Sequence, residues 1–139
     1  METVKGKKVL LVGATGGIGR RTAMQLRQSG AELFLTGRDA GRLQQLADEL
    51  GIPATQTAVV DLSSSGSVEA LHQTYFSVFD SIDVLVNASG IGIIKPLEQL
   101  SEEEFFRTLD VNLVAPFRLM KSFLPAMKQA GKGLVIHIP

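Results

Sequence analysis

The chain has 139 residues, no cysteine, and 14 basic residues balanced by 14 acidic ones. This length allows one domain with a hydrophobic core, so we expect a single domain over residues 1–139. Zero net charge leaves no field that would attract nucleic acid or an anionic membrane, and neither is expected as a partner. Without cysteine there is no disulfide or thiolate metal site, and no metal site is expected.

The N-terminal residues 1–8 are charged and do not resemble a signal peptide. No apolar run approaches the length needed to span a membrane. A cytoplasmic protein is therefore expected.

Strand-like and helix-like segments alternate along the whole sequence, which is typical of a parallel sheet with helices on both faces. The run 82–86 is almost entirely apolar, so it is expected to be a central strand that is buried on both faces. The expected strands are 8–12, 32–36, 55–60, 82–86 and 134–138.

Helices are expected between these strands, and several carry recognisable start signals. Asp39 is a plausible N-cap, and Ser101 with Glu104 has the spacing of a capping box. The segment 110–129 is apolar on more than one face, so it must be buried or must face a partner. The expected helices are 18–28, one capped by Asp39 and ended by Gly51, one carrying Val68, Leu71, Tyr75 and Val78, a short one after Ser101, and the long segment 110–129, with a kink expected at Pro125.

A glycine cluster follows the first strand and precedes the first helix. Gly13 allows a sharp turn, while Gly17 and Gly19 remove side chains where a phosphate and the strand must approach the helix. A helix N-terminus placed after such a turn is typical of a site for a dinucleotide. The spacing fits both G-x-x-x-G-x-G and, through Gly16, G-x-x-G-x-x-G.

Four motifs in the same order resemble the classical short-chain dehydrogenase/reductase family, and the resemblance covers nearly the whole chain. The stretch 12–19 is similar to the family's T-G-x-x-x-G-I-G turn, with Val12 in place of threonine. Asp61-Leu62 matches the pair after the third strand, and the stretch 87–90 (Asn-Ala-Ser-Gly) resembles N-N-A-G. The segments 111–113 and 124–127 are similar to the family's helix signature.

The resemblance implies an α/β fold, a Rossmann-like doubly wound parallel sheet of order 3-2-1-4-5. It implies binding of a nicotinamide dinucleotide, and Arg38 after Gly37 favours NADP over NAD because a cation there suits a 2′-phosphate. A solvated arginine, or one paired with Asp39, is the alternative. The residues expected to bind the cofactor are Gly13, Thr15, Gly16, Gly17, Ile18, Gly19, Arg38, Asp61, Leu62, Asn87, Ala88, Ser89 and Gly90.

By the same resemblance, Asn112 is the one recognisable member of the catalytic tetrad, where it would hold a water in a proton relay. The family's catalytic serine and its Y-x-x-x-K pair have no counterpart here, since the single tyrosine, Tyr75, has Phe79 and not lysine four residues later. We therefore expect the cofactor-binding portion of a carbonyl or alcohol oxidoreductase, truncated after the fifth strand and inactive as this chain alone.

Two alternatives stay open at this stage. A stand-alone nucleotide-binding or assembly module without catalysis would show the same motifs, and Asp61 could serve only to cap a helix. A homo-oligomer is expected through helix 110–129 or through the edge of the fifth strand, because both would otherwise expose apolar surface or unpaired backbone.

Overall fold

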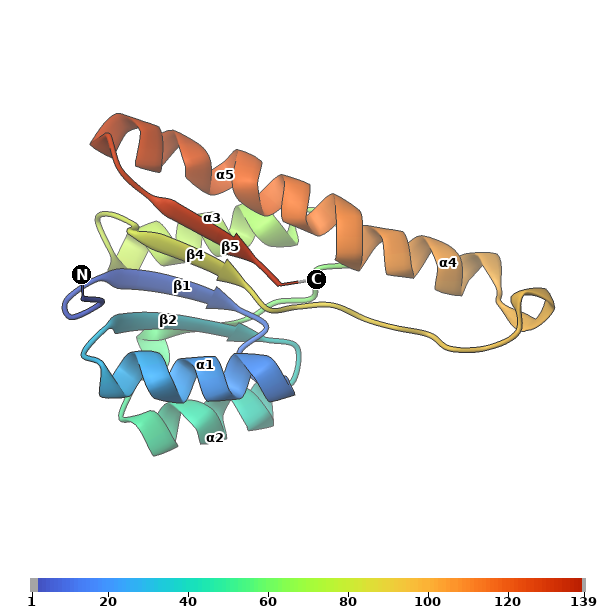
Figure 1. The fold of residues 1–139 in the computed structure, drawn as a ribbon, viewed down its shortest axis with the longest axis horizontal. Coiled ribbons are helices and arrows are strands. Elements are labelled where there is room, and N and C mark those ends of the chain that lie inside the picture. The colour runs from blue at the N-terminus through green and yellow to red at the C-terminus, as the bar shows by residue number, and fades with distance from the viewer. Residues whose placement is uncertain (1–2, 139) are drawn as a thin grey trace.

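The computed structural model describes residues 3–138 and shows a five-stranded, wholly parallel sheet with helices on both faces (Figure 1). The strand order is β3-β2-β1-β4-β5, as the sequence predicts. The strands are β1 (Lys8–Val12), β2 (Glu32–Gly37), β3 (Thr57–Val59), β4 (Val84–Asn87) and β5 (Leu134–His137). Met1, Glu2 and Pro139 lie outside the described residues.

Alternate residues of the central strands pack into separate cores on the two faces of the sheet. Leu10 of β1 belongs to the core under α3 (Ser67–Val78) and α5 (Ala115–Ala130). Its neighbour Leu11 belongs to the core under α1 (Gly17–Gln28) and α2 (Ala40–Leu50). The apolar run of β4 is buried in the same way, since Leu85 joins the first core and Val86 the second, which confirms its central position.

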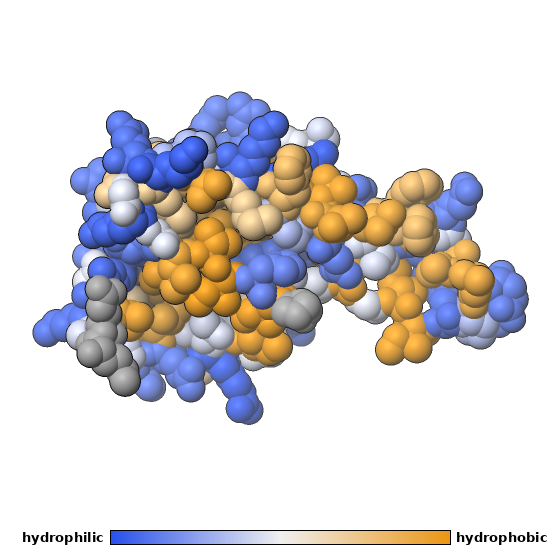
Figure 2. All heavy atoms as spheres, turned by 45° about the horizontal axis from the view of Figure 1, so that its top comes forward, coloured by the Kyte–Doolittle hydropathy of each residue, from blue (hydrophilic) through white to orange (hydrophobic). Residues whose placement is uncertain are grey.

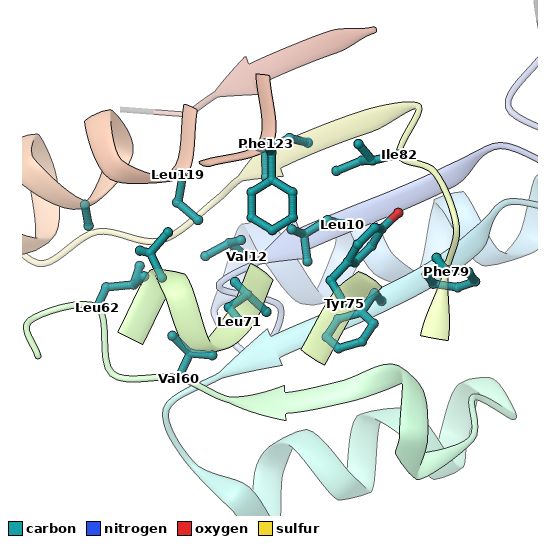
Figure 3. Close-up of a cluster of buried hydrophobic side chains, with 14 of the residues drawn as sticks. Leu10, Val12, Val60, Leu62, Leu71, Tyr75, Phe79, Ile82, Leu119 and Phe123 are labelled. Atoms are coloured by element: carbon teal, nitrogen blue, oxygen red, sulfur yellow. The ribbon is translucent and has the colours of Figure 1, made fainter. Parts of the chain in front are cut away.

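Aromatic rings fill the core under α3 and α5 (Figure 3). The Tyr75 ring is fully buried between Phe34, at a centroid distance of 5.4 Å, and Phe123, at 5.7 Å. Its hydroxyl donates to the Ser81 carbonyl oxygen at 2.8 Å. The single tyrosine of the sequence is therefore a structural residue.

The start signals of two helices are confirmed in detail. The Asp39 carboxylate accepts from the Arg42 N–H at 2.9 Å at the start of α2, and Gly51 ends that helix in the left-handed conformation. Ser101 and Glu104 form a capping box at the start of α4 (Glu102–Leu109).

The structure differs from the sequence prediction at the third strand. Residues 54–56 form a 3-10 turn, η1 (Ala54–Gln56), and the strand is only Thr57–Val59. The turn closes because the Gln56 N–H donates to the Pro53 carbonyl at 2.9 Å, and the Thr57 hydroxyl then donates to the Ala54 carbonyl at 2.7 Å.

The helix expected over 110–129 also differs, because it joins the short helix before it. The helical backbone is continuous from α4 through a π-helical turn, η3 (Asp110–Val114), into α5. A second 3-10 turn, η2 (Leu97–Gln99), precedes α4, and α5 runs through Pro125 to Ala130. Figure 1 shows that the segment after β4 extends away from the sheet and that α4 returns alongside it; we call residues 91–109 the arm.

One face of α5 remains open, as the apolar pattern allows. Ala115, Leu119 and Phe123 of this helix are buried against the sheet. Figure 2 shows apolar surface, in orange, both on the arm and on the part of the molecule that adjoins it. The exposed apolar side chains of η3 and α5 are Leu113, Phe117, Met120 and Leu124, which are 41–64% exposed; we call them the α5 stripe. Within residues 3–138, no helix is both long enough and apolar enough to cross a membrane.

Candidate functional site

A cavity of about 180 Å³ lies at the carboxyl ends of the parallel strands β1 and β4. The chain continues from β1 to its neighbour β2 on one side and from β4 to its neighbour β5 on the other. Such a switch point is the usual ligand site of an open α/β sheet. The turn after β1 and the ends of β2, β3 and β4 all reach it. Its lining residues are Val12, Gly13, Thr15, Gly16, Thr36, Gly37, Arg38, Arg42, Val60, Leu62, Ala88, Ser89, Gly90, Ile91 and Val111.

Glycines allow the close approaches that build this cavity. Gly13 has φ +80°, and a Cβ at this position would lie 2.7 Å from the Ser89 nitrogen, so the turn after β1 can touch the segment after β4 only with glycine. A Cβ at Gly19 would overlap the Gly13 carbonyl oxygen, so this glycine seats α1 against the turn. Gly13 lines the cavity, whereas Gly19 lies outside its lining.

The first turn of α1 lies next to the two strand-end cavities and has no side-chain cap. Gly16 is the N-cap residue, no side chain accepts from the helix N–H groups, and the first turn carries no acidic residue. A Cβ at Gly17 would meet nothing within 4 Å, so the space before it is open. Uncapped N–H groups at the positive end of a helix suit an anionic group such as a phosphate.

Two arginines line the cavity where β2 ends. Neither Arg38 nor Arg42 has an acidic partner within 4.0 Å in the described part of the chain, so the expected alternative of an Arg38–Asp39 pair is not observed. The Asp39 carboxylate instead caps α2. Gly37 leaves room for Thr15, because a Cβ there would lie 2.9 Å from the Thr15 methyl carbon.

Asp61 and Leu62 follow β3 and behave differently. Leu62 is buried and lines the cavity. The Asp61 carboxylate accepts from the Ser63 N–H at 3.0 Å and from the Ser63 hydroxyl at 2.6 Å, and these bonds hold the pKa of Asp61 below its usual range. Asp61 is exposed, lies outside the lining residues and caps its own turn.

A second cavity, of about 460 Å³, adjoins the first through residues 88–91. Ile18 from the start of α1, Asn112 from η3 and His137 from β5 complete its lining together with Gly92 and Ile138. Ala88, Ser89 and Gly90 therefore face both cavities, as a shared wall. Asn87, at the end of β4, is buried behind this wall at 3% exposure.

The Asn112 side chain holds the start of the arm. Its Oδ1 accepts from the Ile91 N–H at 2.9 Å, and its Nδ2 donates to the Ile91 carbonyl at 2.8 Å. Both polar atoms are thus engaged within the protein, at the edge of the second cavity. The catalytic role of Asn112 stays a prediction.

The structure brings most of the predicted residues to the cavities and adds others that were not predicted as site residues, among them Arg42, Ile91, Val111 and His137. Gly17, Gly19, Asp61 and Asn87 lie beside the lining residues rather than among them. Arg42 could have been found from its place in the first turn after the Asp39 cap. Val111 belongs to the segment 111–113 that resembles the family signature, whereas Ile91 and His137 carry no sequence signal, because only the packing of the arm and of β5 brings them here.

The described residues contain no cluster suited to a metal ion, since no group of three histidine or acidic side chains there is arranged to hold one. Tyr75 is in the core, where burial raises its pKa above the ordinary value.

Comparison with known proteins agrees with the motifs. The family model for short chain dehydrogenase matches residues 7–139. An uncharacterized oxidoreductase of Staphylococcus saprophyticus is 31% identical over 138 residues, covering 99% of this chain and 56% of that protein. The 17-beta-hydroxysteroid dehydrogenase type 1 of Homo sapiens is 36% identical over 136 residues, covering 92% of this chain and 41% of that protein.

A solved structure gives the same result in three dimensions. A metagenomic short-chain oxidoreductase in complex with NADP superposes with a TM-score of 0.89 at 31% identity, covering 98% of this chain and 63% of that one. The chain thus spans about half the length of the curated relatives it matches. Its sequence motifs, its strand order and these matches together place it in the short chain dehydrogenase family.

Proposed function

We propose that this chain forms the NADP(H)-binding part of a carbonyl or alcohol oxidoreductase. One observation carries the proposal: Arg38 and Arg42 line the first cavity beside the glycine turn, and neither has an acidic partner among the described residues. Two cations at the end of β2 suit the additional phosphate that distinguishes NADP from NAD.

The chain's own residues fit the rest of the dinucleotide. The uncapped first turn of α1 would receive the central phosphates, and Leu62 would pack against the adenine ring. Ser89 and Gly90 would offer a hydroxyl and bare backbone to a ribose, at the wall that the cavities share. When bound, the cofactor supplies or accepts a hydride. The metagenomic relative that was solved with NADP supports this assignment.

Calorimetric titration of NADP⁺ and NAD⁺ tests the proposal. A charge-assisted contact of about 1.5–3 kcal/mol corresponds to a preference for NADP⁺ of roughly ten- to a hundredfold. Arg38→Ala and Arg42→Ala should each reduce the preference, and the double variant should nearly abolish it. Arg118→Ala, on α5, is the matched control and should change neither affinity. Equal affinities of the native chain for the two cofactors would contradict the NADP assignment.

We further propose that the chain alone turns over carbonyl substrates slowly. Transfer of a hydride to a carbonyl needs a proton donor at the carbonyl oxygen, and the single tyrosine is buried in the core. Loss of a general acid commonly lowers a rate by about 10²–10⁴. NADPH absorbance, followed with a panel of ketones and quinones, measures the activity. Fast oxidation that disappears in Asn112→Ala would contradict the proposal.

The α5 stripe supports a homo-oligomer. Its four side chains form an exposed apolar row along η3 and α5, and the edge strand β5 separately exposes Leu134 and Ile136. A second copy that covers the stripe would remove this apolar area from water. Light scattering at tens of micromolar should show a dimer, and Phe117→Asp should produce a monomer. A monomeric native chain would exclude this assembly.

A further inference from the structure

The orientation of the Asn87 side chain is set by its neighbour Ser89. The Ser89 backbone N–H can only donate, and it lies 3.1 Å from one Asn87 amide atom. That atom must therefore be the acceptor, Oδ1, and the Ser89 hydroxyl bonds the same oxygen. The Nδ2 group of Asn87 then has to face the opposite direction, toward β5.

This orientation determines where the proton of His137 resides. Asn87 Nδ2 lies 3.1 Å from His137 Nδ1, and an amide nitrogen can only donate. Nδ1 must therefore be the accepting, unprotonated nitrogen. The single proton of the neutral His137 ring is consequently on Nε2, at the far edge of the ring.

The second histidine of the sequence provides a contrast. His72 Nδ1 lies 2.9 Å from the Ser122 hydroxyl, which can either donate or accept. Its partner therefore leaves the tautomer of His72 open. His72 also lies against a different cavity, between α3 and α5.

His137 is among the residues that line the second cavity, and its side chain is exposed. Asn87 and His137 are register partners of the paired strands β4 and β5, so the backbone holds the two side chains together. His137 lines the cavity, whereas Asn87 is buried behind it. Within residues 3–138, His137 Nε2 has no hydrogen-bond partner, while both polar atoms of Asn112 already bond Ile91.

We propose that the Nε2–H of His137 donates a hydrogen bond to a carbonyl oxygen of the ligand in the second cavity. The proposal rests on the proposed function, because that function places the ligand there. The carbonyl belongs either to the carboxamide of the cofactor or to a carbonyl substrate. His137 keeps its proton in this role, so it orients and polarises the carbonyl while Asn87 fixes the tautomer.

Nitrogen NMR of the histidine rings tests the tautomer directly. With ¹⁵N-labelled histidine at slightly alkaline pH, the two rings give a simple spectrum. His137 should show a protonated Nε2 and an unprotonated Nδ1 in the free protein. A dominant Nδ1–H form of His137 would overturn the proposal, whatever the ligand does.

Ligand titrations then distinguish the sources of the carbonyl. NADP⁺ is compared with 2′-phospho-ADP-ribose, which lacks the nicotinamide, and with NADP⁺ plus cyclohexanone. A shift of the His137 Nε2 and its proton with NADP⁺ alone assigns the carboxamide, and a shift only after the ketone is added assigns the substrate. The His72 signals should not move in any titration. Calorimetry under the same conditions reports binding independently.

Variants give a second readout. His137→Phe keeps an aromatic ring at this exposed position and should weaken binding of the carbonyl-bearing ligand by about twofold to tenfold without affecting 2′-phospho-ADP-ribose. Asn87→Asp keeps the acceptor for Ser89 but replaces the donor to His137, so it should move the ring proton to Nδ1 and produce the same loss. If Asn87→Asp does not fold, His137→Phe alone decides. Absence of NADP⁺ binding would overturn the proposed function and this inference together, whereas binding that leaves His137 unchanged would overturn this inference alone.

Discussion

Asn112 and Ile91, which are 21 residues apart in sequence, are joined by a pair of hydrogen bonds that uses the whole amide of Asn112. Ile91 begins the arm, and Asn112 lies in the π-helical turn that returns from it. The pair therefore joins the start of the arm to the turn that follows it and keeps the wall shared by both cavities in place; we call these two hydrogen bonds the clasp.

Removal of this clasp should destabilise the arm. Because each hydrogen bond contributes about 0.5–1.5 kcal/mol, Asn112→Ala should lower the free energy of unfolding by about 1–3 kcal/mol. Hydrogen exchange at the Ile91 amide should accelerate at the same time. Asn112→Asp keeps the acceptor for the Ile91 N–H but sets a carboxylate oxygen against the Ile91 carbonyl, so it should not restore the stability. An unchanged Ile91 amide in Asn112→Ala would contradict the role of the clasp.

The two glycines on either side of Ile18 should respond in opposite ways to substitution by alanine. Gly19→Ala places a Cβ against the Gly13 carbonyl and should lower the free energy of unfolding by several kcal/mol or prevent folding. Gly17→Ala meets open space and should change stability by at most about 1 kcal/mol in the favourable direction. If a phosphate approaches Gly17, calorimetry should show weaker NADP⁺ binding by this folded variant, and full affinity would place the phosphate elsewhere.

Tyr75 should make the fold sensitive to alkali. Burial raises its pKa in the folded state above the ordinary value of 10.0, so this tyrosine contributes stability that is complete below pH 10 and falls as the pH rises further. The decline should approach about 1.4 kcal/mol per pH unit above pH 10. Urea unfolding of the native chain and of Tyr75→Phe between pH 8 and 11.5 measures it. The variant should lose the Ser81 hydrogen bond at every pH but should lack this additional slope.

Glu104 should make the arm sensitive to acid. Its carboxylate accepts from the Lys95 ammonium at 2.8 Å and from the Ser101 N–H at 3.3 Å, and these bonds hold the pKa of Glu104 below its ordinary value. The resulting stability is present above the unfolded-state pKa and is lost as the pH falls through the folded-state pKa. Hydrogen exchange in the first turn of α4 should therefore accelerate below about pH 4.5. Glu104→Gln should show faster exchange already at pH 7 and little further change on acidification.

The sequence was most informative where a local rule acts alone. The alternation of Leu10 and Leu11 between two cores follows from strand geometry, and the cap at Asp39 follows from its side chain. The glycine turn was readable because Gly13 and Gly19 are needed for contacts close to them in sequence. These local signals were sufficient to predict a parallel sheet and the position of the first cavity, whereas the strand order came from the family resemblance.

Features that depend on distant contacts could not be predicted. Nothing in the sequence around His137 indicates that it meets Asn87, which is 50 residues earlier. The shared backbone of α4 and α5 was likewise missed, since propensity alone does not distinguish a π-helical turn from a break. Asp61 matched the family motif, yet its carboxylate bonds Ser63; the sequence left a capping role open but could not decide between the two uses.

The π-helical turn η3 has a consequence for how this protein can vary in length. Each α-helical residue advances the helix by about 100°, so deletion of one residue from Asp110–Val114 would change the rotational phase between α4 and α5. Phe105 and Phe106 would then move to another side of the molecule, while Phe117, Met120 and Leu124 of α5 kept their positions. A length change of one residue here would alter the direction of the arm with little cost to the sheet, which makes this turn a place where related chains can diverge in what the arm meets.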